Sequence, residues 1–201
     1  MTQKIVLASN NPGKLREFGA LLGEIGLDVR PQDEFNVPEA EEPFVTFVEN
    51  ALTKARHAAR LTGLPALADD SGVCVNALGG APGVWSARYA GEPKSDATNN
   101  AKLIADLAGH DDKSAYYYCV LIYVRHADDP QPVIADGSWH GEIVEEARGA
   151  GGFGYDPYFF FPPLGLTFAE LSPGDKFRVS HRGNAFRRLL DFLPSRRSRK
   201  I

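Results

Sequence analysis

The sequence predicts an α/β fold with a central mixed β-sheet flanked by helices. In the first half of the chain, short apolar runs typical of strands alternate with segments of helical periodicity. Two long strand-like runs, residues 116–126 and 133–144, then flank Asp128–Asp129–Pro130 and predict a β-hairpin. At 201 residues, 43% hydrophobic and 24% charged, the chain is long enough for a substantial core. We expect a single domain, because neither a repeat nor a linker interrupts it.

The N-terminal elements follow from apolar spacing. Residues 4–8 are a continuous apolar run after Lys4 and predict a buried strand. Asn10 or Asn11 can cap a helix with Pro12 near its first turn, whose apolar stripe is Leu15, Phe18, Leu22 and Ile25. A short strand near residues 27–29 and an acidic loop over residues 39–42 come next. The longest helical signal covers residues 44–61 and ends before Gly63.

The remaining elements alternate with glycine-rich loops. An apolar run, residues 64–68, predicts a short buried strand that ends at Asp69 and Asp70, and Gly72 is expected to turn the chain sharply there. The further elements are a short strand at 73–75, a loop at 79–83, a helix at 96–107, a loop at 149–154 before the aromatic residues 158–161, a last helix near 184–193 and a flexible basic tail at 195–201.

Composition excludes several classes of function. The net charge of −4 argues against non-specific nucleic-acid binding, so an anionic ligand needs a local basic cluster. No apolar run approaches the length of a membrane span, about 18 residues. Cys74 and Cys119 lie in separate strand-like runs, which suggests buried, reduced thiols. With a strand and no signal peptide at the N-terminus, we expect a cytoplasmic protein without membrane or nucleic-acid partners.

The adjacent carboxylates Asp69 and Asp70 are the strongest chemical signal. Like charges repel, so a fold that places two of them at the end of a buried strand usually supplies a cation or a proton. Strand ends also deliver reactive groups to a crevice. The alternative is an acidic turn that faces water or caps the next segment.

The segment Ser9–Asn10–Asn11–Pro12–Gly13–Lys14 joins the first strand to the first helix. Backbone amides at a helix N-terminus, together with a lysine, form an anion site. Lys14 in the first turn opposes the helix dipole, and a bound phosphate would explain it; the alternative is a surface lysine. The segment is not a Walker A loop, because Leu15 replaces the metal-binding Ser or Thr.

Other carboxylates could complete a magnesium site. Magnesium takes one or two carboxylates, phosphate oxygens and water, which Asp69 or Asp70 plus one glutamate would satisfy. Glu41 and Glu42 lie in the acidic loop, and Glu49 lies on the long helix opposite its apolar stripe, where Asn50 and Lys54 share a face. By position alone, a solvated loop charge is the favoured interpretation of Glu41.

Two later segments could recognise a base. Residues 152–157 form a glycine-rich loop with aromatic side chains and Asp156, and Ser180–His181–Arg182 begins the last helix behind Lys176. Aromatic rings stack on bases, while Lys, Arg and His donate to carbonyl and phosphate oxygens. Each segment alone is weak evidence, since such loops often pack in the core and such arginines are often solvated.

Taken together, these segments resemble the inosine triphosphate pyrophosphatase family, whose members are also described as XTP/dITP pyrophosphatases. The matching segments occur in the family's order over nearly the whole chain: residues 9–14, 46–51 with 54–55, 68–72, 80–84, 86–89, 152–157 and 180–182. The resemblance implies an elongated two-lobed fold with the catalytic cleft between the lobes, and a homodimer. It implies Mg²⁺-dependent hydrolysis of ITP, dITP and XTP to the monophosphate and pyrophosphate, which cleanses the nucleotide pool.

The resemblance also implies residue roles. Asp70 would be the general base and a metal ligand, Glu41 a second ligand, and Asp69, Glu49, Asn50 and Lys54 would support them. The triphosphate would be held by Ser9, Asn10, Asn11, Pro12, Gly13, Lys14 and Ser71. Phe153 would stack on the base, beside Gly154 and Tyr155, and the base edge would be framed by Asp156, Lys176, His181 and Arg182.

Three other functions remain open on sequence alone. Asp70–Ser71–Gly72 matches the Asp-Ser/Thr-Gly motif of aspartic proteases, but the chain holds one copy where a dyad needs two, unless a dimer supplies the second. A phosphatase with an aspartate nucleophile is disfavoured, because adjacent acids do not match its alternating Asp-x-Asp spacing. A nucleotide sensor without turnover would have no need for a water-activating acid.

Overall fold

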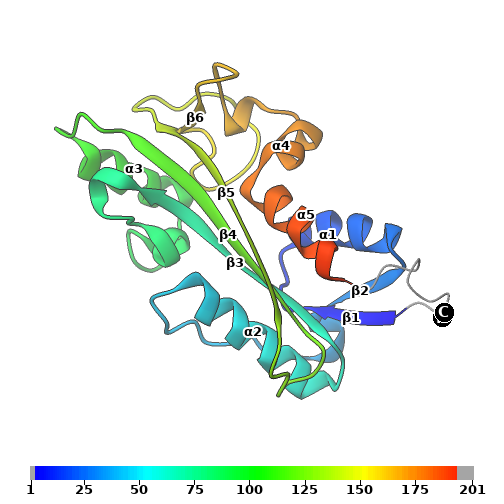
Figure 1. Ribbon diagram of the computed structural model, residues 1–201. Coiled ribbons are helices and arrows are strands. Elements are labelled where there is room, and N and C mark those ends of the chain that lie inside the picture. The colour runs from blue at the N-terminus through cyan, green and yellow to red at the C-terminus, as the bar shows by residue number, and fades with distance from the viewer. Residues whose placement is uncertain (1–2, 194–201) are drawn as a thin grey trace. The chain divides into compact units, whose positions relative to one another are not determined.

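The protein is an α/β protein built on one mixed sheet. The computed structural model describes residues 3–193, so the expected basic tail at 195–201 lies outside the described residues. The sheet has seven strands in the order β2-β1-β3-β4-β5-β6-β7 (Figure 1). The strands are β1 (Gln3–Leu7), β2 (Leu27–Pro31), β3 (Ala66–Val75), β4 (Ser114–Val124), β5 (Val133–Ile143), β6 (Phe159–Phe161) and β7 (Leu166–Thr167). The predicted fold class is therefore confirmed.

In the described part of the chain, five α-helices accompany the sheet. They are α1 (Pro12–Glu24), α2 (Phe47–Thr62), α3 (Asp96–Leu107), α4 (Pro173–Val179) and α5 (His181–Phe192). The predictions for α3 and the β4–β5 hairpin are confirmed, whereas the short helix α4 was not predicted. Within residues 3–193, no helix combines the length and apolarity needed to cross a membrane.

The chain divides into two compact units. Unit 1 comprises residues 1–70, 120–135 and 186–201, and unit 2 comprises residues 71–119 and 136–185. In unit 1, β1 pairs in parallel with both β2 and β3, and α1 packs against β2. Phe18 and Phe186 are buried there with ring centroids 6.0 Å apart.

Unit 2 has an aromatic core. Tyr117, Trp139, Phe159 and Phe168 are buried in one cluster, with Trp139 and Phe168 only 3.8 Å apart between ring centroids. Trp139 lies on β5, Phe159 lies on β6, and Phe168 follows β7. Strand β6 pairs antiparallel with both β5 and β7. Cys74 and Cys119 are buried thiols that form no disulfide with each other, as the sequence suggested.

One prediction near the carboxylates was wrong. The chain does not turn at Gly72; β3 continues through it to Val75, so Asp69 and Asp70 lie within a strand and not at its end. A Cβ atom at Gly72 would lie 2.3 Å from the carbonyl oxygen of Gly83 and 2.5 Å from Oγ of Ser86. Glycine is thus required because another segment packs against the strand, whereas a turn had been expected from its backbone freedom.

Candidate functional site

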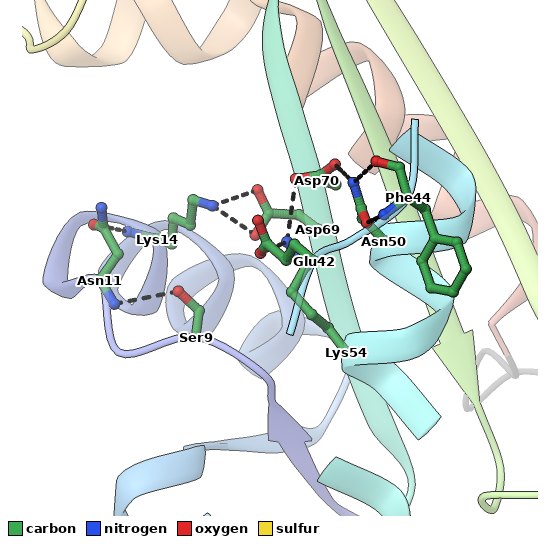
Figure 2. Close-up of polar contacts among 9 residues, drawn as sticks. All are labelled: Ser9, Asn11, Lys14, Glu42, Phe44, Asn50, Lys54, Asp69 and Asp70. Carbon is green, nitrogen blue, oxygen red and sulfur yellow. Dashed lines mark hydrogen bonds and ion pairs between the residues drawn. The ribbon is translucent and has the colours of Figure 1, made fainter. Parts of the chain in front are cut away.

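Strand β3 carries two buried carboxylates, each of which meets its own lysine. Successive side chains of a strand point to opposite sides, so Asp69 and Asp70 separate although they are adjacent in sequence. Nζ of Lys14 lies 2.7 Å from Oδ2 of Asp69, and Nζ of Lys54 lies 3.1 Å from Oδ1 of Asp70 (Figure 2). Each carboxylate of this acidic pair therefore has a lysine ammonium group beside it.

The Lys14–Asp69 pair begins at the N-terminus of α1. The Asn11 side chain caps this helix by accepting from the backbone amides of Gly13 (2.8 Å) and Lys14 (3.2 Å). Ser9 Oγ in turn accepts from the backbone amide of Asn11 at 3.2 Å. Lys14 at this end opposes the helix dipole, and the almost fully buried carboxylate of Asp69, 1% exposed, offsets that cost.

The surroundings of Asp70 shift the pKa of its carboxyl group. Burial raises its pKa, and the neighbouring Lys54 ammonium opposes that rise without cancelling it. Burial also acts to lower the pKa of Lys54, but the charges of Asp70, Asp69 and Glu42 outweigh it, so this pKa is raised. Lys54 thus stays protonated beside a carboxylate that is more basic than usual.

Helix α2 presents Lys54 and Asn50 on one face toward Asp70, as the spacing of four predicted. The helix is capped by Thr46, whose side chain accepts from the backbone amide of Glu49. Nδ2 of Asn50 lies 3.5 Å from Oδ2 of Asp70, and the same amide exchanges two hydrogen bonds of 3.1 Å with the backbone of Phe44. Asn50 therefore ties the chain that follows the acidic loop to the site.

The acidic loop reaches this cluster through Glu42. Oε1 of Glu42 lies 2.7 Å from Nζ of Lys54, whereas Glu41 is exposed. The sequence alone does not show which of the two glutamates turns inward, because loop positions carry no periodicity. Glu49, also exposed, accepts a 2.5 Å hydrogen bond from the Thr46 hydroxyl and so contributes to the helix cap.

Carboxylate oxygens are the type of protein ligand that magnesium takes. Within residues 3–193, no three or more His, Cys, Asp or Glu side chains gather as a ready-made metal site. Asp70 and Glu42 nevertheless both approach Nζ of Lys54, which marks a place where two carboxylates hold a positive charge. Magnesium suits such a place, because it takes few protein carboxylates and completes its shell with water and phosphate oxygens.

A second group of polar residues surrounds Asp156 in unit 2. Its Oδ2 accepts from the backbone amide of Phe153 at 2.8 Å and forms an ion pair with Lys176. Its Oδ1 accepts from the hydroxyl of Tyr117 at 3.2 Å. Gly152, with φ of +75°, makes room, since a Cβ there would lie 2.0 Å from Oδ2. The loop is therefore folded around this carboxylate.

The rest of this loop is anchored from α3. The backbone amide of Gly154 donates to Asp96 at 2.7 Å, and its carbonyl accepts from Asn100 at 2.9 Å. Tyr155 is buried and its hydroxyl donates to the carbonyl of Ser86 at 2.8 Å, so this side chain packs in the core. Phe153, in contrast, is 56% exposed, with Nζ of Lys176 5.0 Å from its ring centroid.

The start of α5 completes the group in unit 2. His181 and Arg182 are buried, and the His181 ring stacks on Tyr117 at 4.8 Å with an interplanar angle of 11°. Ser71 lies in β3, half-buried, and begins unit 2. Asn10 is exposed, and Pro12 and Gly13 form the first turn of α1.

Sequence reasoning missed three members of this group: Tyr117, Asp96 and Asn100. Tyr117 lies in a strand between two other tyrosines. Strand alternation shows that its side chain lies on the opposite face from theirs, but does not show which loop it contacts. Asp96 and Asn100 lie four apart on one face of α3, which is a signal for a shared partner but does not identify it.

Comparisons with known proteins show which family the chain belongs to. Residues 5–192 match the Ham1 family. The chain is 67% identical over 194 residues to a dITP/XTP pyrophosphatase of Ralstonia nicotianae, covering 95% of this chain and 96% of the relative. It is 65% identical over 190 residues to a dITP/XTP pyrophosphatase of Chromobacterium violaceum, covering 94% and 96%.

Solved structures give the same result. A HAM1 protein from Coxiella burnetii matches with a TM-score of 0.90 at 50% identity, covering 93% of this chain and 96% of that one. The Staphylococcus aureus Ham1 protein matches with a TM-score of 0.87 at 40% identity, covering 94% and 97%. The family match covers nearly the whole described part of the chain, and the chain belongs to the Ham1 family.

Proposed function

We propose that this protein is a nucleoside triphosphate pyrophosphatase that converts the deaminated purine nucleotides dITP, ITP and XTP to the monophosphate and pyrophosphate. The observation that carries the proposal is the buried Asp70 beside Lys54, because it places a basic carboxylate on β3 next to a fixed cation on α2. The relatives named dITP/XTP pyrophosphatase support the choice of substrate class.

Asp70 is the proposed general base. A carboxylate is normally a weak base toward water, and burial raises the pKa of Asp70 toward the range where proton transfer is efficient. Lys54 keeps the carboxylate ionised and oriented, and Asn50 restrains its second oxygen. The attack of water breaks the bond between the α and β phosphates, so pyrophosphate leaves with the bond's electron pair.

Asp70 and Glu42 are the side chains best placed to hold a magnesium ion, with Glu41 as the ligand that the resemblance favours. When bound, magnesium would neutralise phosphate charge and make an attacking water more acidic. The protein itself contributes positioning and positive charge, which is what phosphoryl transfer chiefly requires. Lys14 and the amide-rich turn at residues 9–14 are proposed to bind the triphosphate.

Recognition of the base is proposed for unit 2. Phe153 exposes its ring for stacking, and Lys176 or Arg182 can donate to a 6-keto oxygen. The amino group of adenine would instead place donor against donor, and mismatches of this kind reach discrimination of roughly 10⁴. Guanine also carries the 6-keto group, so rejection of GTP requires a further contact at position 2.

The test is a product analysis by phosphorus NMR. Purified protein is mixed with dITP, ITP, XTP, ATP and GTP, each with and without Mg²⁺. Metal-dependent release of pyrophosphate from the first three, with little from ATP or GTP, is the expected result. Orthophosphate would mean that another bond is cleaved. Tight dITP binding without turnover would favour a nucleotide sensor.

The proposal includes a cytoplasmic homodimer. A dimer is expected from the family resemblance alone, and sedimentation analysis of the purified protein tests it. A monomeric mass together with full activity would remove the dimer from the proposal and leave the chemistry intact.

A further inference from the structure

Tyr117 connects residues that are proposed to recognise the base, although it is a strand residue. It lies on β4, where buried and half-buried residues alternate, and it is the tyrosine that faces the core of unit 2. Tyr116 and Tyr118 on either side of it are half-buried. A tyrosine at this position can therefore contact both the loop at residues 152–157 and the start of α5 from the core of unit 2.

The hydroxyl of Tyr117 completes the hydrogen bonding of Asp156. The donors on this carboxylate are divided between its oxygens, with Tyr117 on Oδ1 and with Phe153 and Lys176 on Oδ2. Burial, and then the charge of Asp156, raise the pKa of Tyr117 well above its usual value, so the hydroxyl stays a donor at every working pH. The hydroxyl thereby selects the orientation in which Oδ2 faces Lys176.

The ring of Tyr117 restrains other groups. It stacks on His181 at 4.8 Å and packs edge-on against Phe168 at 5.3 Å. Nζ of Lys176 lies 4.6 Å from the centroid of the same Phe168 ring. Lys176 is thus held between a carboxylate and a ring that both contact Tyr117.

We propose that Tyr117 is a specificity-determining positioning residue, whose hydroxyl holds Asp156 so that Lys176 is aimed at the 6-keto oxygen of a deaminated purine. The inference rests on the proposed function and deepens it. Tyr117 acts through Asp156 and Lys176 and does not touch the substrate. Its loss should therefore weaken recognition of keto purines and leave the phosphate chemistry, which unit 1 residues perform, unchanged.

The first test compares Tyr117→Phe with Tyr118→Phe. Both variants lose one hydroxyl that donates to an aspartate, at 3.2 Å for Tyr117 with Asp156 and 3.1 Å for Tyr118 with Asp136. For Tyr117→Phe we expect kcat/KM for dITP to fall about tenfold, the equivalent of about 1.4 kcal/mol, through KM. Activity toward dATP and kcat should be unchanged, so discrimination falls tenfold. Tyr118→Phe should match the wild type.

The second test separates positioning from general stability. If Tyr117 acts through Lys176, Tyr117→Phe should cause no further loss of discrimination in a Lys176→Met background. Losses that multiply in the double variant would overturn the proposal, as would equal losses toward dITP and dATP. Thermal melting of each variant shows whether the fold is retained.

Binding measurements make the outcome independent of turnover. In the Asp70→Asn protein, calorimetry gives the Kd of dITP and dATP with and without Tyr117→Phe. Binding that is tenfold weaker for dITP and unchanged for dATP supports the inference. It does so even if the wild-type protein hydrolyses neither nucleotide, because absent hydrolysis would refute only the proposed function. Unchanged Kd values would refute the inference while product analysis still decides the function.

Discussion

Lys14 and Asp69, 55 positions apart in sequence, form an ion pair of 2.7 Å that ties the first turn of α1 to the middle of β3. Asp69 is 1% exposed, so the ion pair lies in a place that water hardly reaches. Removing one partner of a buried pair leaves the other charge without compensation, which costs about 3 kcal/mol. We therefore expect Lys14→Met to lower the free energy of unfolding by about that amount, measured by urea denaturation.

An exposed pair provides the control. Lys102 and Asp106 lie 2.8 Å apart on the surface of α3, with 42% and 31% of their side chains exposed. Such pairs contribute at most about 0.5 kcal/mol, so Lys102→Met should change stability little. The double variant Lys14→Met/Asp69→Asn should recover part of the loss. Equal effects of the two lysine variants would show that burial of Asp69 does not matter.

Replacement of Asp70 should remove catalysis and spare binding. Asp70→Asn keeps the shape of the side chain and its contact with Asn50 but cannot accept a proton from water. Loss of a general base typically costs 10²–10⁴-fold, so we expect kcat for dITP to fall by about 10³. Nucleotide binding, followed by calorimetry, should remain measurable.

Asp69→Asn is the matched comparison for that variant. It changes the adjacent residue of the same strand, whose carboxylate forms the ion pair with Lys14. Its effect on kcat should be much smaller, with a larger effect on stability. A well-folded Asp70→Asn protein that retained turnover would end the assignment of Asp70 as the base.

Gly72 offers a test of the close packing behind the carboxylates. An alanine there would place its Cβ 2.3 Å from the Gly83 carbonyl oxygen and 2.5 Å from Ser86 Oγ. Ser86 Oγ also accepts from the backbone amide of Val73 at 2.9 Å, so the clash should disturb that contact too. Overpacking of this kind costs about 1–3 kcal/mol, and we expect Gly72→Ala to lower the melting temperature.

The control for Gly72→Ala is Gly23→Ala. Gly23 lies on the exposed side of α1, and a Cβ there meets nothing within 4 Å. Alanine is a better helix former than glycine by about 1 kcal/mol, so this variant should be stabilised. If both substitutions moved the melting temperature in the same direction, the clash at β3 would not be the cause.

The sequence predicted the longer helices α1, α2, α3 and α5 and the hairpin because their signals are local. The apolar stripe and a cap at Asn10 or Asn11 predicted α1, for which the structure shows Asn11 as the cap. Gly63 predicted the end of α2, and the two strand-like runs predicted β4 and β5. The same local logic failed at Gly72, where a turn was expected. What requires glycine there is the approach of Gly83 and Ser86, which are distant in sequence.

The candidate site was predictable in its residue types but not in its pairings. Asn50 and Lys54 share a helical face, so their joint contact with Asp70 follows from a spacing of four. Nothing in the sequence shows that Asp69 forms an ion pair with Lys14 while Asp70 forms one with Lys54. Whether Glu41 or Glu42 turns toward Lys54 is likewise decided by the path of a loop, which periodicity cannot describe.

Asp129 should make stability depend on pH in the acid range. It is 1% exposed in the β4–β5 turn and accepts from the backbone amides of Arg125 (2.9 Å) and Gln131 (3.0 Å) and from the Arg125 guanidinium. The guanidinium, ahead of the backbone donors, holds the pKa of this carboxyl well below its usual range. The folded state therefore keeps Asp129 ionised at a pH where the unfolded chain has taken up a proton.

The sign follows from the lowered pKa. The stabilisation is fully present above the pKa of an unfolded aspartate, about 3.9, and is lost as the pH falls below it. Asp129→Asn should be less stable near neutral pH, by about 2 kcal/mol for the lost charged hydrogen bonds, and should lose less stability between about pH 5 and 3. Urea denaturation over this pH range measures both effects. Asp128→Asn, whose side chain is 89% exposed, should keep the wild-type pH dependence, and an equally steep acid loss in Asp129→Asn would assign the effect to other carboxyls.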